Sequence, residues 1–333
     1  MKKIAVCLPS YNEEDNIENI TMKIDKALRS VSNNYRCVIV NCDSGSTDKT
    51  NEIFRSLKTR VKKVSILNKE KGKGVNIISF MDYCYKNNID YAFTFDADLT
   101  SFEEEWIYKI LDKLKDNDFV VPIYKRRRYE GNTTNHLMIP LIYYYYGVIV
   151  RQPIGGDYGF NKSYIKKFQK YKTDFIRGYG IDIFMFLLAL KEVRVSEVSL
   201  GFKRHKPSYG KMEKIFKEVL ISFDKTRKYL GDIDNISFSG EGILSIDSSL
   251  DEEFYDYYRV RDTYNFKLEE SNWVLTLKKY LKYSRIDNLS EFLASFRCYT
   301  RAYWREFKDK SPEECERQIY DLAYLLKEEK VCL

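Results

Sequence analysis

Short apolar runs alternate with amphipathic stretches along the first 124 residues, and each run ends in a polar loop. The runs have strand length and contain β-branched and aromatic residues, whereas the longer stretches repeat apolar residues at helical spacing. The expected strands cover residues 3–8, 37–40, 64–67, 91–95 and 119–124. Four helices are expected between these strands. The first has Asn12 as its N-cap, the second follows the polar turn 41–50, and the other two cover residues 75–85 and 103–114. This alternation predicts an α/β fold with a mainly parallel sheet that helices cover on both faces.

Two carboxylates follow the fourth expected strand, where the chain reads YAFTFDADLT over residues 91–100. Residues i and i+2 of an extended chain point to the same side, so Asp96 and Asp98 would face one crevice at the carboxyl edge of the sheet. Paired carboxylate oxygens suit Mg²⁺ or Mn²⁺ held jointly with a substrate's phosphates. The pair by itself also fits a strand that ends in a solvated turn. Our hypothesis is a metal-bound nucleoside diphosphate-sugar at this strand end.

Three more polar loops follow expected strands: P-S-Y-N-E-E at residues 9–14, D-S-G-S-T-D at 43–48 and K-G-K-G at 71–74. Parallel strands place their carboxyl ends at one edge of the sheet. The three loops and the D-A-D motif should therefore line the same crevice.

The composition indicates a globular protein. Of the 333 residues 44% are hydrophobic, which suffices for a core, and the net charge of +7 is compatible with an anionic substrate or a membrane surface. The seven cysteines include no C-x-x-C pair, which favours reduced thiols in a cytoplasmic protein. The first apolar run is too short for a secretory signal, and no stretch is long enough to predict a transmembrane helix.

The alternation stops after Lys125. A basic stretch covers residues 125–130, an expected loop covers 131–135, and residues 136–150 are apolar and helix-length. Two glycine-rich segments follow, Q-P-I-G-G-D-Y-G-F from residue 152 and G-Y-G-I-D from residue 178.

The last third of the chain is predicted to be mainly helical. An expected strand covers residues 193–202, and expected helices cover 214–230, 273–283, 289–307 and 312–327. We predict a domain over residues 1–210, with a nucleotide-binding half at 1–124 and an acceptor and metal half at 125–210. A C-terminal helical region would cover residues 211–333.

In this order, P-S-Y-N-E-E, D-S-G-S-T-D-x-T, the G-K-G loop and D-A-D resemble a GT-A glycosyltransferase of the family 2 type. The later P-I-G-G-D-Y-G, G-Y-G-I-D and F-K-R-H segments are similar to retaining enzymes such as glucosyl-3-phosphoglycerate synthase and, more distantly, mannosylglycerate synthase. The resemblance extends to about Pro207. It implies a Rossmann-like GT-A domain that moves a hexose, with Mg²⁺ or Mn²⁺, from a nucleoside diphosphate-sugar such as a UDP-sugar.

The resemblance also implies roles for matching residues. Asp98 and His205 would ligate the metal, and Asp96 would reach the ribose or the metal's water shell. Asp182 would orient the sugar while the acceptor hydroxyl enters on the side of the departing phosphate, so that configuration is retained. The donor would be held by Pro9, Tyr11, Glu13, Asp43, Ser44, Lys73, Asp96, Ala97, Tyr179 and Gly180.

Local structure offers a second interpretation of several of these residues. Asp43 fits an Asx turn that caps the next helix, and Asp182 fits a helix N-cap. Lys73 fits an exposed flexible loop, and His205 fits a surface histidine among cations.

The acceptor pocket is expected from residues 131–135 and 155–157, because their glycines permit close approach of a ligand. The predicted contacts are Asn132, Thr133, Thr134, Gly156 and Asp157. Relatives that use phosphoglycerate carry an arginine at the position of Asn132, and they tend to have an asparagine soon after the metal-binding histidine, where Pro207 stands here. The acceptor is therefore expected to be small, with its anionic character left open. An inverting route would need a general base, for which Asp157 is a second candidate.

Other functions remain open at this point. A membrane-peripheral enzyme would use a polyprenyl phosphate or another lipid acceptor, with the basic, aromatic C-terminal region on the lipid. The presence of Asp96, Asp98 and Asp182 disfavours a sugar-nucleotide-binding protein without turnover. Nucleic-acid binding through residues 125–128 and 203–206 is disfavoured because few basic residues lie along one helix. The missing Q-x-x-R-W motif argues against a polysaccharide synthase, and the sequence leaves a homodimer open.

Overall fold

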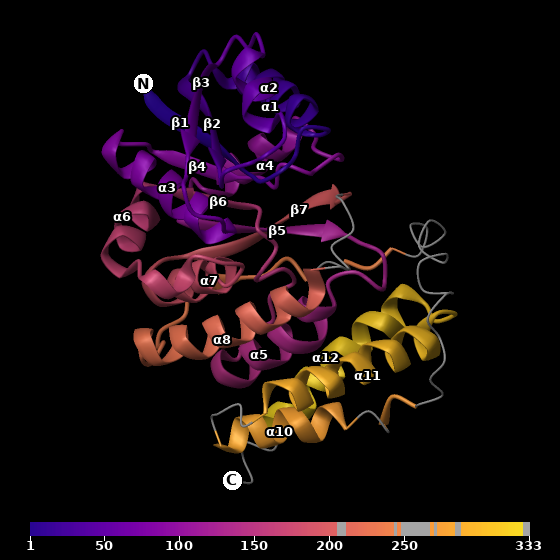
Figure 1. The fold of residues 1–333 in the computed structure, drawn as a ribbon. Helices are drawn as coiled ribbons and strands as arrows, with labels where there is room; N and C mark the ends of the chain where they lie inside the picture. The colour runs from indigo at the N-terminus through magenta and orange to yellow at the C-terminus, as the bar shows by residue number, and fades with distance from the viewer. Residues whose placement is uncertain (205–210, 243–244, 248–266, 270–271, 284–287, 329–333) are drawn as a thin grey trace. The chain divides into compact units, whose positions relative to one another are not determined.

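The computed structural model describes residues 1–204, 211–242, 245–247, 267–269, 272–283 and 288–328 (Figure 1). Its contacts divide the chain into two compact units. The first comprises Met1–Tyr124, Gln152–Tyr209 and Glu218–Glu241, and the second comprises Lys125–Arg151, Gly210–Lys217 and Gly242–Leu333. The division into domains at residue 210 remains a prediction.

The first unit is built on an eight-stranded sheet with the order β3-β2-β1-β4-β6-β5-β7-β8. The strands are β1 (Lys2–Ser10), β2 (Tyr35–Asp43), β3 (Lys62–Leu67), β4 (Tyr91–Thr94), β5 (Phe119–Lys125), β6 (Tyr158–Asn161), β7 (Val195–Phe202) and β8 (Phe238–Ser239). β1 runs parallel to β2 and β4, and β2 runs parallel to β3, whereas β6 is antiparallel to β4 and β5. The predicted α/β fold with a mainly parallel sheet is confirmed.

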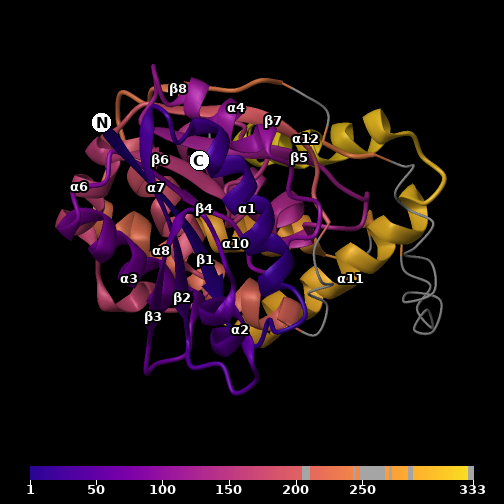
Figure 2. The same ribbon diagram turned by 90° about the horizontal axis from the view of Figure 1, so that it is seen from above.

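Helices cover both faces of this sheet (Figures 1 and 2). One face carries α1 (Ile17–Val31), α2 (Thr50–Ser56) and α4 (Glu105–Lys113), and the other carries α3 (Lys73–Lys86), α6 (Lys162–Tyr171) and α7 (Ile181–Glu192). A 3₁₀ turn, η2 (Asp174–Ile176), lies between α6 and α7, and α8 (Met212–Leu230) follows β7. The predicted stripe of α1 is buried: Ile17, Ile20, Ile24, Leu28 and Val31. It packs with Ile4, Val6 and Leu8 of β1 in the core between sheet and helices.

The predicted N-cap of the first helix was wrong. α1 begins at Ile17, and Asn12 has a positive φ of 55° within the preceding loop. Its side-chain Oδ1 accepts a hydrogen bond from the Thr47 amide at 2.9 Å, and its own amide donates to Ser46 Oγ. Asn12 therefore ties the loop after β1 to the loop after β2, a long-range contact that a local capping rule does not detect.

The strand β6 and the helix α6 were not predicted. The glycine-rich stretch that contains β6 has no strong strand pattern, and β6 forms because it fits between β4 and β5. A Cβ atom on Gly159 would lie 2.1 Å from Ile110 Cγ2, so this glycine is what allows α4 to pack directly on the strand.

The second unit is helical. It contains the π-helical turn η1 (Thr134–Met138), α5 (Ile139–Tyr146), α10 (Trp273–Tyr283), α11 (Leu289–Phe307) and α12 (Pro312–Glu328). The three C-terminal helices were predicted with nearly these bounds. The Trp273 ring packs against Phe292 and Phe296, with centroids 5.1 and 5.2 Å away. The helix predicted over residues 136–150 instead begins as η1 and ends before Gly147, whose φ of 70° stops it.

The basic stretch after β5 is used inside the second unit. Arg128 is 5% exposed and donates to the carbonyls of Phe307, Lys308 and Lys310, at 2.7–2.8 Å, where α11 ends. Arg127 pairs with Glu130 at 3.3 Å. Because these guanidinium groups already have partners, the stretch does not offer the free row of cations that nucleic-acid binding would need.

No helix in the described part of the chain is both long and apolar enough to cross a membrane. The six cysteines within that part are free thiols.

Candidate active site

Charged side chains from five segments meet at the carboxyl edge of the sheet in the first unit. Lys73 is the first residue of α3, Asp96 and Asp98 follow β4, Asp157 precedes β6, Asp182 lies in the first turn of α7, and Lys203 follows β7. The predicted convergence of the K-G-K-G loop and the D-A-D motif is seen here, whereas the meeting of Asp182 with them was not predicted from the strand order.

Two lysines alternate with three carboxylates in one connected group, which we call the charge network: Asp182, Lys73, Asp96, Lys203 and Asp157. Lys73 Nζ lies 3.1 Å from both Asp96 Oδ1 and Asp182 Oδ2. Lys203 Nζ lies 3.0 Å from Asp96 Oδ2 and 2.5 Å from Asp157 Oδ2. Each carboxylate oxygen of Asp96 therefore faces one ammonium group.

Most of this network is buried. The exposed fraction is 3% for Lys203, 1% for Asp157 and 5% for Asp182. Buried charges are tolerated when every one of them is paired and hydrogen-bonded. Lys203 meets this condition with a third acceptor, the Gly155 carbonyl at 3.1 Å.

Asp157 uses both of its oxygens to hold the D-A-D loop. Its Oδ1 accepts from the Asp96 amide at 2.9 Å, while its Oδ2 accepts from Lys203. These bonds favour a positioning role for Asp157 over the acceptor contact or general base that we predicted.

The network sets the protonation of its carboxyl groups. Burial would raise the pKa of Asp96, but Lys73 and Lys203 outweigh it and hold that pKa well below its usual range. Burial raises the pKa of Asp182 to about 6, although Lys73 opposes the shift. Asp96 therefore stays ionised, whereas Asp182, which has one lysine partner instead of two, has a pKa close to neutral pH.

Asp98 differs from its neighbours because no lysine pairs with it. It is partly exposed, and it forms no hydrogen bond or ion pair with the residues that the structure describes. Burial, together with the charges of Asp96 and Glu13, raises the pKa of Asp98 to about 7. Lysines neutralise Asp96, but no described lysine pairs with the neighbouring Asp98. The carboxylate of Asp98 is therefore suited to bind a cation from solution.

The glycines around Lys73 leave room for neighbouring backbone. Cβ atoms on Gly72 and Gly74 would lie 2.2 Å from Arg177 O and 1.8 Å from Ile176 O. The amides of Gly74 and Val75 donate to the carbonyls of Gly178 and Arg177 at 3.1 Å. The first turn of α3 is therefore closed by protein, and it holds Lys73 beside Asp182.

The G-Y-G-I-D segment is packed in a similar way against α8. Cβ atoms on Gly178 and Gly180 would lie 2.1 Å from Glu218 Oε2 and 2.3 Å from Ser222 Cβ. The Tyr179 amide donates to Glu218 Oε2 at 2.7 Å. Asp182 sits in the first turn of α7, whose N-cap is Gly180, so its carboxylate points to Lys73 and does not cap the helix.

The loops after β1 and β2 lie at the same edge. Tyr11 is 38% exposed, and Lys71 stands over its ring and donates to its hydroxyl at 2.6 Å. Asp43 is fully buried and accepts a hydrogen bond from the Ser46 amide at 2.7 Å. This bond forms the Asx turn that was the alternative to a donor contact for Asp43. Ser44 is also buried and donates to the Gly72 carbonyl. Of this group, Tyr11 offers the most accessible surface to a ligand.

The other predicted residues are distributed as follows. Ala97 is buried between the two aspartates, and a Cβ atom on Gly156 would lie 2.2 Å from Lys73 Nζ, so Gly156 leaves room for the network. Pro9 lies near the end of β1, and Glu13 lies in the loop that follows this strand. Asn132, Thr133 and Thr134 belong to the second unit. His205 lies outside the described residues.

Lys203 is the member of the network that our residue assignments missed. The sequence shows it only as one of several cations in K-R-H-K. Its position directly after a strand at the carboxyl edge was the available signal. Nothing local indicates that it is buried between Asp96 and Asp157.

Comparison with known proteins agrees with this geometry. Residues 5–175 match the family described as "Glycosyl transferase family 2". A dolichol-phosphate mannosyltransferase of Pyrococcus furiosus is 26% identical over 263 residues, which is 73% of this chain and 69% of that protein. An uncharacterised glycosyltransferase of Synechocystis sp. is 28% identical over 133 residues, or 39% of this chain and 40% of that protein.

Solved structures share the fold. Glucosyl-3-phosphoglycerate synthase from Mycobacterium tuberculosis, in complex with Mn²⁺, UDP and glucosyl-3-phosphoglycerate, superposes with a TM-score of 0.54 at 20% identity. The match covers 68% of this chain and 80% of that one. The same enzyme with Mg²⁺ and UDP gives a TM-score of 0.54.

The fold is thus the GT-A fold, and its C-terminal helices extend it as predicted. The chain belongs to glycosyl transferase family 2. It is a glycosyltransferase.

Proposed function

We propose that this enzyme transfers a hexose from a nucleoside diphosphate-sugar, with UDP as the nucleotide, using Mg²⁺ or Mn²⁺. The observation that carries the proposal is the contrast between Asp96, whose oxygens are both paired with lysines, and Asp98, which has no cation partner among the residues that the structure describes. The complexes of the M. tuberculosis enzyme with UDP and Mn²⁺ or Mg²⁺ support the same nucleotide and ions.

Within the described residues no group of three His, Cys, Asp or Glu side chains could hold a metal ion. We therefore infer that a divalent ion would be held by Asp98 together with the donor's diphosphate, with His205 as the second proposed protein ligand, offered as a neutral imidazole. When bound, such an ion supplies positive charge to the diphosphate that leaves the sugar.

The chain's own residues supply the rest of the site. Lys73 and Lys203 fix the carboxylate of Asp96 so that it stays ionised and can accept hydrogen bonds from a ribose hydroxyl. Tyr11 offers an exposed ring. The ends of β1 and β2, with Pro9 and Asp43, and the loops that follow them, with Glu13 and Ser44, form the edge on which the nucleoside would lie. Because these groups are held before the donor arrives, little reorganisation accompanies the reaction.

A nucleotide panel tests the donor proposal. Ligands that bind only the folded state stabilise it by mass action. UDP and UDP-sugars with Mn²⁺ are expected to raise the melting temperature, whereas the same ligands with EDTA, and GDP with Mn²⁺, are expected to raise it much less. If no nucleotide gives a metal-dependent shift, the proposed donor site is incorrect.

Two classes of acceptor are proposed, a small anion and a polyprenyl phosphate. A small anionic acceptor is favoured by the fold of glucosyl-3-phosphoglycerate synthase, which has been solved with phosphoglyceric acid. A polyprenyl phosphate is favoured by the similarity to a dolichol-phosphate mannosyltransferase, in which more of this chain is aligned at higher identity. Co-sedimentation with anionic vesicles distinguishes them: binding supports the lipid acceptor, and the absence of binding supports the small one.

We also propose retention of configuration, with Asp182 orienting the sugar. Asp157 is bonded through both oxygens, so it is poorly placed to deprotonate an acceptor. The anomeric configuration of the product, measured by NMR at early times, tests this proposal. An inverted anomeric configuration would instead mean that a side chain of the site deprotonates the acceptor as a general base, and Asp182 would be the leading candidate.

Asp182→Asn is expected to lower turnover about 10²-fold while UDP affinity changes little, since Asp182 would act on the sugar and not on the nucleotide. Turnover is measured with saturating UDP-sugar, and UDP affinity is measured by calorimetry with Mn²⁺. Equal losses in both quantities would show that Asp182 acts only through Lys73.

A further inference from the structure

Two polar side chains of α8 contact the backbone just before Asp182. They are Glu218, which is half-buried, and Ser222, which is 3% exposed. Residues four apart lie on the same face of a helix, so both side chains reach the segment 177–180, which belongs to the same compact unit. The sequence shows these two residues only as polar positions of an amphipathic helix.

Each side chain bonds to one backbone group of this segment. The Tyr179 amide donates to Glu218 Oε2 at 2.7 Å. Ser222 Oγ donates to the Gly180 carbonyl at 2.8 Å. The same carbonyl accepts from the Phe184 amide at 3.2 Å, which closes the first turn of α7. Ser222 therefore holds the start of α7, while Glu218 holds the residue just before that start.

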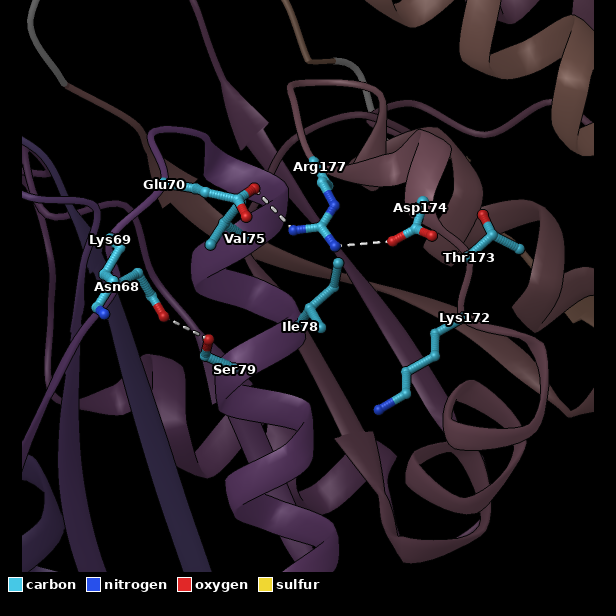
Figure 3. Close-up of a pocket in the computed structure, with 10 residues that line it drawn as sticks. All are labelled: Asn68, Lys69, Glu70, Val75, Ile78, Ser79, Lys172, Thr173, Asp174 and Arg177. Atoms are coloured by element: carbon cyan, nitrogen blue, oxygen red, sulfur yellow. Dashed lines mark hydrogen bonds and ion pairs between the residues drawn. The ribbon is translucent and has the colours of Figure 1, made fainter.

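The helix α3 holds the same segment through other backbone groups. Its first turn donates two amides, at 3.1 Å, to the carbonyls of Arg177 and Gly178. The Arg177 side chain also pairs with Glu70 at 2.8 Å and with Asp174 at 2.7 Å, as Figure 3 shows. These side chains are exposed, and exposed ion pairs contribute little to stability. The buried contacts of the segment thus come from α3 and α8.

The segment links the two helices that supply Lys73 and Asp182. Lys73 is the first residue of α3, and Asp182 lies in the first turn of α7. Their side chains meet at 3.1 Å, and the segment between them in space is bonded to both helix ends. A shift of this segment would therefore change how Asp182 is presented to a sugar beside Lys73.

The side chain of Tyr179, in the middle of the segment, lies within the field of the charge network. Burial raises the pKa of its hydroxyl, Lys73 opposes this shift, and the charges of Asp96 and Asp98 add to it. Tyr179 is one of the residues that we predicted to contact the donor. Its backbone amide is the group that Glu218 holds.

Packing alone does not require polar groups at this place. The helix buries three apolar side chains next to them: Val219, Leu220 and Phe223. Such burial already attaches a helix to the fold. The segment instead has glycines where the two polar side chains approach, since Cβ atoms on Gly178 and Gly180 would lie 2.1 and 2.3 Å from them. The close contact therefore serves the two side-chain-to-backbone hydrogen bonds.

We propose that Glu218 and Ser222 are positioning residues for the transfer reaction, which act by holding Asp182 in place beside Lys73. The inference rests on the proposed role of Asp182 in orienting the sugar. Because the two residues hold the part of the site that would act on the sugar, the expected effect of changing them is on turnover, with little change in UDP affinity.

Hydrogen exchange of the protein without ligand tests the contact itself. Glu218→Ala removes the acceptor of the Tyr179 amide and should speed exchange at that amide about tenfold. Glu218→Gln keeps an oxygen that can accept this bond, so its exchange should stay close to that of the wild type. Glu105→Ala is the matched control, since Glu105 is exposed on α4 and pairs with Lys109 of the same helix.

Hydrolysis of UDP-glucose with Mn²⁺ tests the effect on turnover. Glu218→Ala and Ser222→Ala should each lower kcat about tenfold, with UDP affinity within about twofold of the wild type. Glu218→Gln should keep most of the activity, and Ser56→Ala, at an exposed serine of α2, should keep all of it. In an Asp182→Asn background the alanine changes should have little further effect, because they act through Asp182.

Three outcomes would overturn the proposal. They are unchanged exchange at the Tyr179 amide in Glu218→Ala, unchanged kcat in both alanine variants, and the same fold loss of kcat in the wild-type and Asp182→Asn backgrounds. The last result would mean that α8 only stabilises the fold. Failure of the donor proposal is distinguishable, because the wild type would then show no metal-dependent UDP binding, while exchange at the Tyr179 amide would still report on Glu218.

Discussion

Asp98→Asn is expected to abolish the dependence of UDP binding on Mn²⁺ and to lower the rate of donor hydrolysis by about 10²-fold or more. The substitution keeps the size of the side chain but removes the charge of Asp98, a carboxylate beside Asp96 that no lysine in the described residues pairs with. Asp96 cannot replace it, because its two oxygens face Lys73 and Lys203. Calorimetry of UDP with Mn²⁺ and with EDTA measures the effect.

Asp116→Asn is the matched control, since Asp116 is an exposed carboxylate outside the site. It should bind UDP as the wild type does in both buffers. Metal-dependent binding that persists in Asp98→Asn would remove Asp98 from the proposed ligands, and it would shift attention to Asp96 with Lys203 displaced.

The sheet could be predicted because its signals are local. Each strand in the first 124 residues is a short apolar run that ends in a polar loop, and the buried stripe of α1 repeats at helical spacing. The meeting of Lys73 and Asp96 also followed, since parallel strands share one carboxyl edge, whereas the place of Asp182 beside them did not. The three C-terminal helices have strong amphipathic patterns, and they were predicted within about one residue.

Other features depend on contacts between distant parts of the chain. Asn12 was expected to cap a helix, but its partners are Ser46 and Thr47. Gly72 and Gly74 are required because the carbonyls of residues 176–177 occupy the space beside them. No periodicity or spacing carries this information, because each contact joins segments that only the finished sheet brings together.

Lys203 is the clearest example of such a contact, and it leads to a strong prediction. It lies in a run of cations that resembles a solvated flank, yet its ammonium group is buried between Asp96 and Asp157. Lys203→Met preserves most of the side-chain volume and removes the charge. It leaves Asp157 buried without a cation, which is expected to lower the free energy of unfolding by about 3–5 kcal/mol.

The same change should weaken UDP binding, because Asp96 loses one of the two contacts that fix its carboxylate. Denaturant unfolding measures the stability, and Lys115→Met, which breaks an exposed pair with Asp112, should leave the midpoint unchanged. Adding Asp157→Asn to Lys203→Met removes the unpaired charge and should restore part of the lost stability, by about 1–3 kcal/mol. If the double variant is no more stable than Lys203→Met, the loss arises from packing around the lysine stem, and the charge network does not organise this edge of the sheet.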